Sequence, residues 1–191
     1  QLNESILDLF AAPGGKCTYI SEKLQNTGEV IAVDKSPAKM KLLKQAADRL
    51  QLTNIKMIVE DSLKYGPVAP AYHRVLVDAP CSGWGVMGRK ADLRWQKHQD
   101  IDELVKLQEK ALNYAVNFVR PEGFLVYSTC TMNPRENEEQ VTKFLQKNPK
   151  FKLVNAEHHI PHEFTEHHYL KTIPYKHFMD GAFAAKMQRI S

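Results

Sequence analysis

The sequence predicts an α/β domain in which a mostly parallel sheet carries helices on both faces. Three observations indicate this fold class. Short apolar runs recur along the chain, as is typical of buried parallel strands, and segments with apolar residues at helical spacing separate several of them. Acidic or thiol side chains follow several runs, at the strand ends where open α/β folds build their sites. The chain has 191 residues, 43% of them hydrophobic, which is enough for one substantial core.

The first predicted strand covers residues 5–10 and runs into a turn that contains two glycines. Residues 11–16 read Ala-Ala-Pro-Gly-Gly-Lys, and a helix is expected from about residue 16 to 25. Glycine lets a ligand approach the backbone, and the helix N-terminus favours an anionic group. The turn lacks the Gly-x-Gly-x-x-Gly spacing of dinucleotide binders, which disfavours a nicotinamide-dependent dehydrogenase.

The next two predicted strands are each followed by an aspartate. Asp34 ends the strand over residues 30–34, roughly twenty residues after the glycines, the spacing at which an acid meets a ribose in nucleotide-binding α/β folds. Ser36 then opens a helix to about residue 50, and Asp61 follows the strand over residues 55–60. Asp34 is therefore the predicted ribose ligand.

Two cysteines also stand at strand ends. The strand over residues 74–78 ends at Asp78 and runs into Ala79-Pro80-Cys81-Ser82-Gly83, while the strand over residues 123–127 leads to Cys130. A lone free cysteine is most often a small buried hydrophobe. Two thiols and an aspartate at strand ends instead indicate a site, with Cys130 as the predicted nucleophile.

The segment after Cys130 is expected to form a helix over residues 134–146. Asn133 would cap this helix and Glu136 would complete a capping box. The helix N-terminus would then favour the reactive thiolate form of Cys130.

Two stretches leave alternatives open. The connection over residues 83–95 holds two tryptophans and three basic residues, which suits stacking on splayed bases and contacts to phosphates. It equally suits a loop whose tryptophans cover the core. Six histidines between residues 158 and 177 suggest a metal site, but Glu166 stands where metalloprotease spacing needs a histidine. We favour a solvated, mobile loop there over a metal site.

The remaining elements complete the predicted domain. A helix from about residue 101 to 119 precedes the strand that leads to Cys130. Residues 152–154 and 182–186 are the last two predicted strands and are expected to form an antiparallel hairpin at the sheet edge.

Composition narrows the class of protein. Three widely spaced cysteines without a Cys-x-x-Cys pair argue against a disulfide framework and a structural zinc site, and they fit a reducing cytoplasm. No apolar run is long enough to span a membrane. The net charge of +4 is compatible with nucleic acid but does not indicate it. Because neither an initiating methionine nor a signal peptide is present, we expect residues 1–191 to be a single catalytic domain from a longer protein.

Three segments resemble the signature motifs of S-adenosylmethionine-dependent RNA cytosine-5 methyltransferases, the NOL1/NOP2/Sun family. They are residues 8–16 (Asp-Leu-Phe-Ala-Ala-Pro-Gly-Gly-Lys), 78–83 (Asp-Ala-Pro-Cys-Ser-Gly) and 128–131 (Ser-Thr-Cys-Thr). The resemblance covers about residues 6–148, with the motifs in the family's order. Residues 88–95 are most similar to the bacterial Sun (RsmB) type, which methylates small-subunit ribosomal RNA.

The resemblance implies a fold, a cofactor and a partner. The fold is the Rossmann-like class I methyltransferase fold, a mostly parallel seven-stranded sheet with helices on both faces and an antiparallel edge hairpin. The cofactor is S-adenosylmethionine and the partner is RNA, with small-subunit ribosomal RNA as the expected substrate. The family also carries an N-terminal helical segment and usually a separate RNA-binding region, which this chain is expected to lack.

The resemblance also implies residue roles. Cys130 is the nucleophile and Cys81 assists release, while Lys16 and Asp78 lie between the cofactor and the target base. Asp34 holds the ribose hydroxyls and Asp61 faces the adenine. The positions expected to contact the cofactor are Ala12, Pro13, Gly14, Gly15, Lys16, Asp34, Lys39, Asp61 and Asp78.

The expected chemistry explains why two thiols are needed. A thiolate that adds to carbon 6 of cytosine turns the ring into an enamine, whose carbon 5 attacks the sulfonium methyl group. The adduct then persists until a base removes the proton from carbon 5, the step in which Cys81 assists. The target base has to be unpaired or flipped out for this attack.

Three other functions remain open at this point. A DNA cytosine-5 methyltransferase would use Cys81, in its Pro-Cys pair, as nucleophile and would leave Cys130 without a task. A transfer RNA methyltransferase of the same family would use the same residues as the ribosomal RNA enzyme. A noncatalytic RNA-binding domain would keep the fold as a scaffold, since fold does not fix function.

Overall fold

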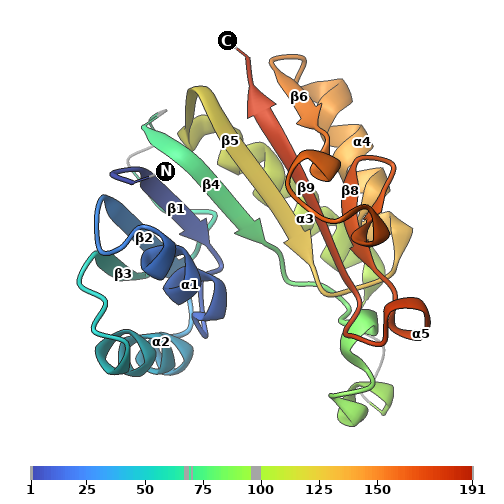
Figure 1. The fold of residues 1–191 in the computed structure, drawn as a ribbon, viewed down its shortest axis with the longest axis horizontal. Coiled ribbons are helices and arrows are strands. Elements are labelled where there is room, and N and C mark those ends of the chain that lie inside the picture. The colour runs from blue at the N-terminus through green and yellow to red at the C-terminus, as the bar shows by residue number, and fades with distance from the viewer. Residues whose placement is uncertain (1, 67–68, 70, 96–99, 191) are drawn as a thin grey trace.

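The computed structural model describes residues 2–66, 69, 71–95 and 100–190, which form a twisted sheet with helices packed against it (Figure 1). The strands in these ranges are β1 (Ser5–Leu9), β2 (Glu29–Asp34), β3 (Ile55–Val59), β4 (Tyr72–Asp78), β5 (Val119–Thr129), β6 (Phe151–Val154), β7 (Thr165–Glu166), β8 (Tyr169–Thr172) and β9 (Ala182–Arg189). The α-helices are α1 (Gly15–Lys23), α2 (Pro37–Arg49), α3 (Ile101–Ala115), α4 (Glu138–Lys147) and α5 (Pro174–His177).

The sheet has a parallel part and an antiparallel part. β3, β2, β1, β4 and β5 are parallel neighbours in that order. β9 then pairs antiparallel with β5, and both β6 and β8 pair antiparallel with β9. The strand order reverses between β1 and β4, so the carboxyl ends of these two strands flank the position where open α/β sheets bind ligands.

All seven predicted strands are present. The last two of them, β6 and β9, pair antiparallel as predicted. The structure adds two short strands, β7 and β8, within the histidine-rich segment. β8 continues the sheet beyond β9, so β9 lies inside the sheet rather than at its edge.

Alternate residues of the strands supply the two layers of the core. Leu7 and Leu9 of β1 belong to a buried cluster with side chains of α3 and α4, such as Leu112 and Phe144. Ile6, on the opposite face of β1, packs in a second cluster formed mainly with α1 and α2. Successive side chains of a strand point to opposite faces of the sheet, so an apolar strand has to be covered on both sides. The helices provide this cover.

The segment after β5 differs from its prediction. Asn133 caps a short 3-10 helix, Pro134–Glu136, by accepting a hydrogen bond from the Arg135 N–H (3.1 Å). Asn137 then interrupts the segment with φ −116° and ψ −103°, and α4 begins only at Glu138. The prediction of one continuous helix with a capping box is wrong, because the Glu136 side chain turns into the interior instead of capping.

The histidine-rich segment is also more regular than predicted. Besides β7, β8 and α5 it contains the short 3-10 helices Ala156–His158 and His162–Phe164, and the side chains of Tyr169 and Thr172 are buried. The prediction of a loop is therefore wrong for much of it, whereas the predicted solvent exposure is confirmed for five of its six histidines, all but His177. Among the described residues, no group of three or more histidine, cysteine, aspartate or glutamate side chains is arranged to hold a metal ion. In the same ranges, no helix combines the length and apolar character needed to cross a membrane.

Candidate active site

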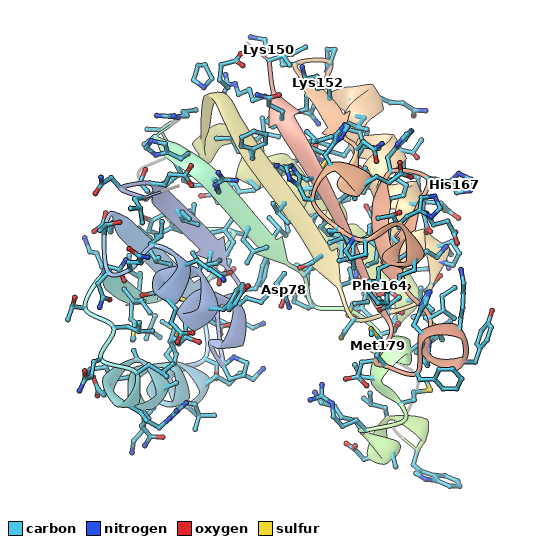
Figure 2. All side chains as sticks on the ribbon, in the orientation of Figure 1. Asp78, Lys150, Lys152, Phe164, His167 and Met179 are labelled. Carbon is cyan, nitrogen blue, oxygen red and sulfur yellow. The ribbon has the colours of Figure 1, made fainter. Side chains whose placement is uncertain are left out.

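The carboxyl ends of β2, β4 and β5 bring the predicted site residues to one edge of the sheet. Asp34 and Asp78 are the last residues of β2 and β4, and Cys130 directly follows β5. Figure 2 shows Asp78 at the end of β4, on the side of the sheet where α1 begins. The strand-end pattern of the sequence thus corresponds to one shared edge in space.

The carboxylate of Asp78 is held from two sides. Lys16 Nζ, in the first turn of α1, lies 2.7 Å from Asp78 Oδ2. The Ser128 hydroxyl, near the end of β5, donates to Asp78 Oδ1 at 2.6 Å. Lys16 and Asp78 are both partly exposed, so this charge-assisted pair remains accessible to a bound molecule.

The two strand-end cysteines are in direct contact. Their Sγ atoms lie 3.3 Å apart, and the backbone N–H of Cys130 also points to Cys81 Sγ at 3.3 Å. Cys130 is exposed, whereas Cys81 is only partly exposed. The structure therefore places both predicted thiols in one site and leaves Cys130 the more accessible of the two.

The surroundings of the two thiols shift their pKa values in opposite directions. The hydrogen bond from Cys81, followed by the charges of Lys90 and Lys16, lowers the pKa of Cys130 from 9.0 to about 7, against the opposing effects of burial and of Asp78. The same hydrogen bond, together with burial and the Cys130 charge, raises the pKa of Cys81. Above about pH 7 the pair therefore holds one thiolate, on Cys130, and one thiol, on Cys81. The predicted effect of a helix N-terminus on this thiolate stays a prediction.

Glu136 is fully buried, with 0% of its surface exposed, and its carboxylate joins the two cysteine-bearing turns. Ser82, which directly follows Cys81, donates to this carboxylate through its backbone N–H (2.9 Å) and its hydroxyl (2.6 Å). Gln108 of α3 and Asn133 donate at 3.0 and 3.2 Å. Four donors thus satisfy a buried carboxylate that would otherwise be costly to desolvate.

Further hydrogen bonds extend this network along both turns. Gln108 also donates to the Pro80 carbonyl at 2.9 Å, immediately before Cys81. Asn137 accepts from the Thr129 hydroxyl (2.6 Å) and donates to the Thr131 carbonyl (2.9 Å), on either side of Cys130. Residues before and after each cysteine are therefore fixed by one connected set of side chains.

The glycine turn after β1 leaves space above its backbone. Gly14 adopts a left-handed conformation (φ 113°), and a side chain there would overlap Leu43 of α2. The peptide bond between Ala12 and Pro13, just before it, is cis. Apart from its chain neighbours and the nearby backbone of α1, no heavy atom of the described residues lies within 4 Å of the position that a Gly15 side chain would occupy. The turn is thus closed on the α2 side and open at Gly15.

Asp34 is nearly buried beneath this turn. Its carboxylate accepts the backbone N–H of Ala12 at 3.2 Å and that of Ser36 at 2.9 Å. Each carboxylate oxygen can accept a further hydrogen bond, so these contacts orient Asp34 without using all its acceptors. Asp61 is partly exposed just beyond β3, the neighbour of β2. Lys39 is exposed in the first turn of α2, where its backbone N–H donates to Ser36.

Asp8 is a buried acid that the sequence analysis did not single out. Its side chain is 1% exposed, and neither carboxylate oxygen has a hydrogen-bond partner among the described residues. Burial, followed by the charge of Asp78, raises its pKa well above the usual range; Asp34 adds to this, and Lys16 opposes it. An acid inside an otherwise apolar strand was the available signal. Asp8 stands next to the predicted cofactor residues with both oxygens unpaired.

The tryptophans of the connection after β4 are both exposed. Trp84 lies in the short 3-10 helix Trp84–Val86, and Trp95 follows another, Ala91–Arg94. The alternative in which these rings cover the core is therefore wrong. The side chain of Arg94, one of the three basic residues noted there, lies outside the described part of the structure.

Comparison with known proteins identifies the family. The family model for the 16S rRNA methyltransferase RsmB/F matches residues 1–188. The chain belongs to the RsmB/F family. It is 39% identical to the probable ribosomal RNA small subunit methyltransferase B of Bacillus subtilis, over 98% of this chain and 43% of that protein. This membership confirms the resemblance drawn from the three motifs.

Two archaeal comparisons extend the similarity within the family. The chain is 32% identical to the tRNA (cytosine(72)-C(5))-methyltransferase of Pyrococcus horikoshii, over 98% of this chain and 48% of that protein. The crystal structure of NSun6 from Pyrococcus horikoshii with SFG superposes with a TM-score of 0.83 at 31% identity, over 99% of this chain and 48% of that one. The Rossmann-like class I methyltransferase fold is thereby confirmed. The RsmB/F chain described here spans less than half the length of each of these three relatives.

The thiol pair predicts a pH-dependent reaction with iodoacetamide. Because the pKa of Cys130 is lowered to about 7, its thiolate is present above that pH and the alkylation rate should fall as pH drops below it. Cys81→Ala removes the hydrogen bond that is the largest cause, so the midpoint should move up toward 9.0. Mass spectrometry of the modified peptide measures both profiles.

Two controls accompany this titration. Cys81→Ser keeps a hydroxyl donor and should shift the midpoint less than Cys81→Ala. Cys17, which is fully buried, should remain unmodified in the folded protein. An alkylation midpoint of Cys130 that is the same with and without Cys81 would contradict the assigned cause.

The Glu136 network predicts a loss of stability on a nearly isosteric change. Glu136→Gln replaces one acceptor oxygen by an amide N–H₂ group, which is itself a donor. The donors that bonded this oxygen in the parent protein then have no acceptor. The free energy of unfolding should fall by about 1–3 kcal/mol, measured by urea denaturation. Glu139→Gln, at an exposed position of α4, is the matched control and should change it by less than about 0.5 kcal/mol. Equal midpoints for the two variants would show that the network contributes nothing.

Proposed function

We propose that this RsmB/F chain transfers a methyl group from S-adenosylmethionine to carbon 5 of a cytosine in RNA. Cys130 forms a covalent bond to the base, and Cys81 assists its release. The observation that carries this proposal is the 3.3 Å contact between two thiols of opposite pKa shift, beside the Lys16–Asp78 pair.

The residues around the glycine turn fit S-adenosylmethionine. The open space at Gly15 leaves room for the methionine part, and the Asp34 carboxylate keeps acceptors for ribose hydroxyls. The unpaired oxygens of Asp8 would gain a hydrogen-bond partner from a cation such as the ammonium group of the methionine part. Asp61 would face the adenine. When bound, the cofactor supplies an electrophilic methyl group.

The chain's own residues account for activation of the base. The exposed Cys130 thiolate adds to carbon 6 of cytosine, which moves electron density to carbon 5. Lys16 and Asp78, held 2.7 Å apart, are placed to hydrogen-bond and orient the ring. The lowered pKa of Cys130 and its exposure favour it as nucleophile over Cys81, which argues against the DNA-type mechanism.

The same contact explains how Cys81 becomes able to assist release. As long as Cys130 is a thiolate, its hydrogen bond and its charge raise the pKa of Cys81. Once Cys130 is bonded to carbon, that charge is gone and Cys81 more readily gives up its own proton to solvent water, which leaves a thiolate on Cys81. Cys81, directly or through a water, can then accept the proton from carbon 5, after which the carbon–sulfur bond to Cys130 breaks.

The substrate that we propose is small-subunit ribosomal RNA, supported by the family model and by the Bacillus relative. A transfer RNA is the second candidate, favoured by the similarity to the archaeal tRNA enzyme. The chain spans less than half the length of these relatives. We therefore propose that it corresponds to their catalytic domain, and that the other parts of those proteins contribute to the choice of RNA. Three unpaired cysteines are typical of proteins in a reducing compartment, which supports the cytoplasm as the location that we propose for this reaction.

The test is a denaturing gel of Cys81→Ala mixed with S-adenosylmethionine and either small-subunit ribosomal RNA or transfer RNA. A covalent protein–RNA band should form, because the adduct is made and cannot be released. The band should be absent from Cys130→Ala and from the double variant. A band that requires Cys81 and persists without Cys130 would contradict the proposal and support the DNA-type mechanism, and the RNA that gives the stronger band identifies the substrate class.

A further inference from the structure

A surface hollow of about 340 Å³ lies between the segment that follows β4 and the segment around α5. Gly85, Gly88 and Arg89 line one side, and Pro174, Phe178 and Asp180 line the other. Figure 1 shows α5 beside the segment that leaves β4, and Figure 2 shows Met179, the next residue of the lining, between the two. None of the site residues discussed above lines this hollow.

The hollow shares a wall with the thiol pair. The Gly85 N–H donates to the carbonyl of Cys130 at 3.0 Å, and the Gly181 N–H donates to the carbonyl of Gly85 at 2.8 Å. A side chain at Gly85 would overlap Gly181 and come within 2.8 Å of the Cys130 carbonyl oxygen. The three segments therefore pack backbone to backbone, and a ligand in the hollow would lie close to a base held at Cys130.

Phe178 combines an exposed apolar ring with an unfavourable backbone conformation. It is 94% exposed, and its backbone has φ 52°, a left-handed conformation that is unusual for a bulky side chain. Tyr175, in the short helix α5 that Phe178 caps, is 81% exposed, and Met132 and Met179 are also exposed. Unfavourable backbone conformations of this kind concentrate at functional sites.

The opposite wall supplies charge. Arg89 Nε lies 3.0 Å from Asp180 Oδ2, and the guanidinium has further N–H groups beyond this contact. The next residue, Lys90, is close enough for its charge to act on Cys130. An exposed apolar ring and an arginine that line the same hollow suit a nucleotide, whose base stacks on aromatic rings and whose phosphate binds arginine.

We propose that this hollow binds an unpaired nucleotide adjacent to the target cytosine, with its base stacked on Phe178 and its phosphate held by Arg89. This inference rests on the proposed RNA methylation. A cytosine that reaches Cys130 has left its stack, so the neighbouring base has lost a stacking partner. The hollow offers that base a new one. Its continuity with the Cys130 backbone favours RNA over a protein segment as the occupant.

The test uses adduct formation in the Cys81→Ala background with two single-stranded RNA pools. Each RNA carries one central cytosine; in the second pool the nucleotides on both sides of it are abasic. With the normal pool, Phe178→Ala should slow adduct formation by about tenfold or more, since base–aromatic stacking is lost. With the abasic pool the two proteins should react at equal rates. Phe178→Tyr keeps a ring and should restore the rate.

The controls separate this inference from the function on which it rests. Tyr19→Ala removes another exposed aromatic ring, on α1, and should react like the parent with both pools. If Phe178→Ala also reacts like the parent while the parent forms the adduct, the nucleotide site is refuted and a protein segment becomes the occupant. If the parent forms no adduct with any RNA, the proposed function itself fails and this inference fails with it.

Discussion

The buried carboxylate of Glu136 connects the turn after β4 to the turn after β5, and the position of both thiols depends on it. Its donors come from three places in the chain: Ser82, Gln108 and Asn133. Displacing either turn would leave a buried donor or the carboxylate itself without a hydrogen-bond partner, which lowers the stability of the folded protein. The 3.3 Å thiol contact is therefore maintained by a network in which neither sulfur takes part.

The thiol contact in turn divides the labour between two residues of the same type. Two sulfur atoms this close do not both ionise at neutral pH, so one proton is held between them and the exposed Cys130 carries the charge. Lys16 and Lys90 support that charge from outside, while Asp78 opposes it and keeps the shift moderate. Identical side chains thus acquire complementary roles from exposure and neighbours alone, and each role changes once Cys130 has bonded to carbon.

The sequence predicted what depends on local pattern. Apolar runs followed by Asp34, Asp78 and Cys130 located the strands and the edge that they share, because parallel strands have their carboxyl ends on one side. Glu136 was misassigned because its spacing from Asn133 also matches a capping box, and only the fold reveals that its partners are Ser82 and Gln108. The contact between Gly85 and Gly181 joins residues 96 positions apart in sequence, so no local pattern predicts the hollow beside Phe178.

The division of roles between Cys130 and Cys81 is tested most directly by following the carbon 5 proton itself. RNA with tritium at carbon 5 of cytosine would be incubated with radiolabelled S-adenosylmethionine, and tritium release compared with methyl incorporation. The account predicts equal release and incorporation for the unmodified protein, and methyl incorporation without tritium release for Cys81→Ala. Stoichiometric tritium release by Cys81→Ala would contradict it, because another group would then remove the proton.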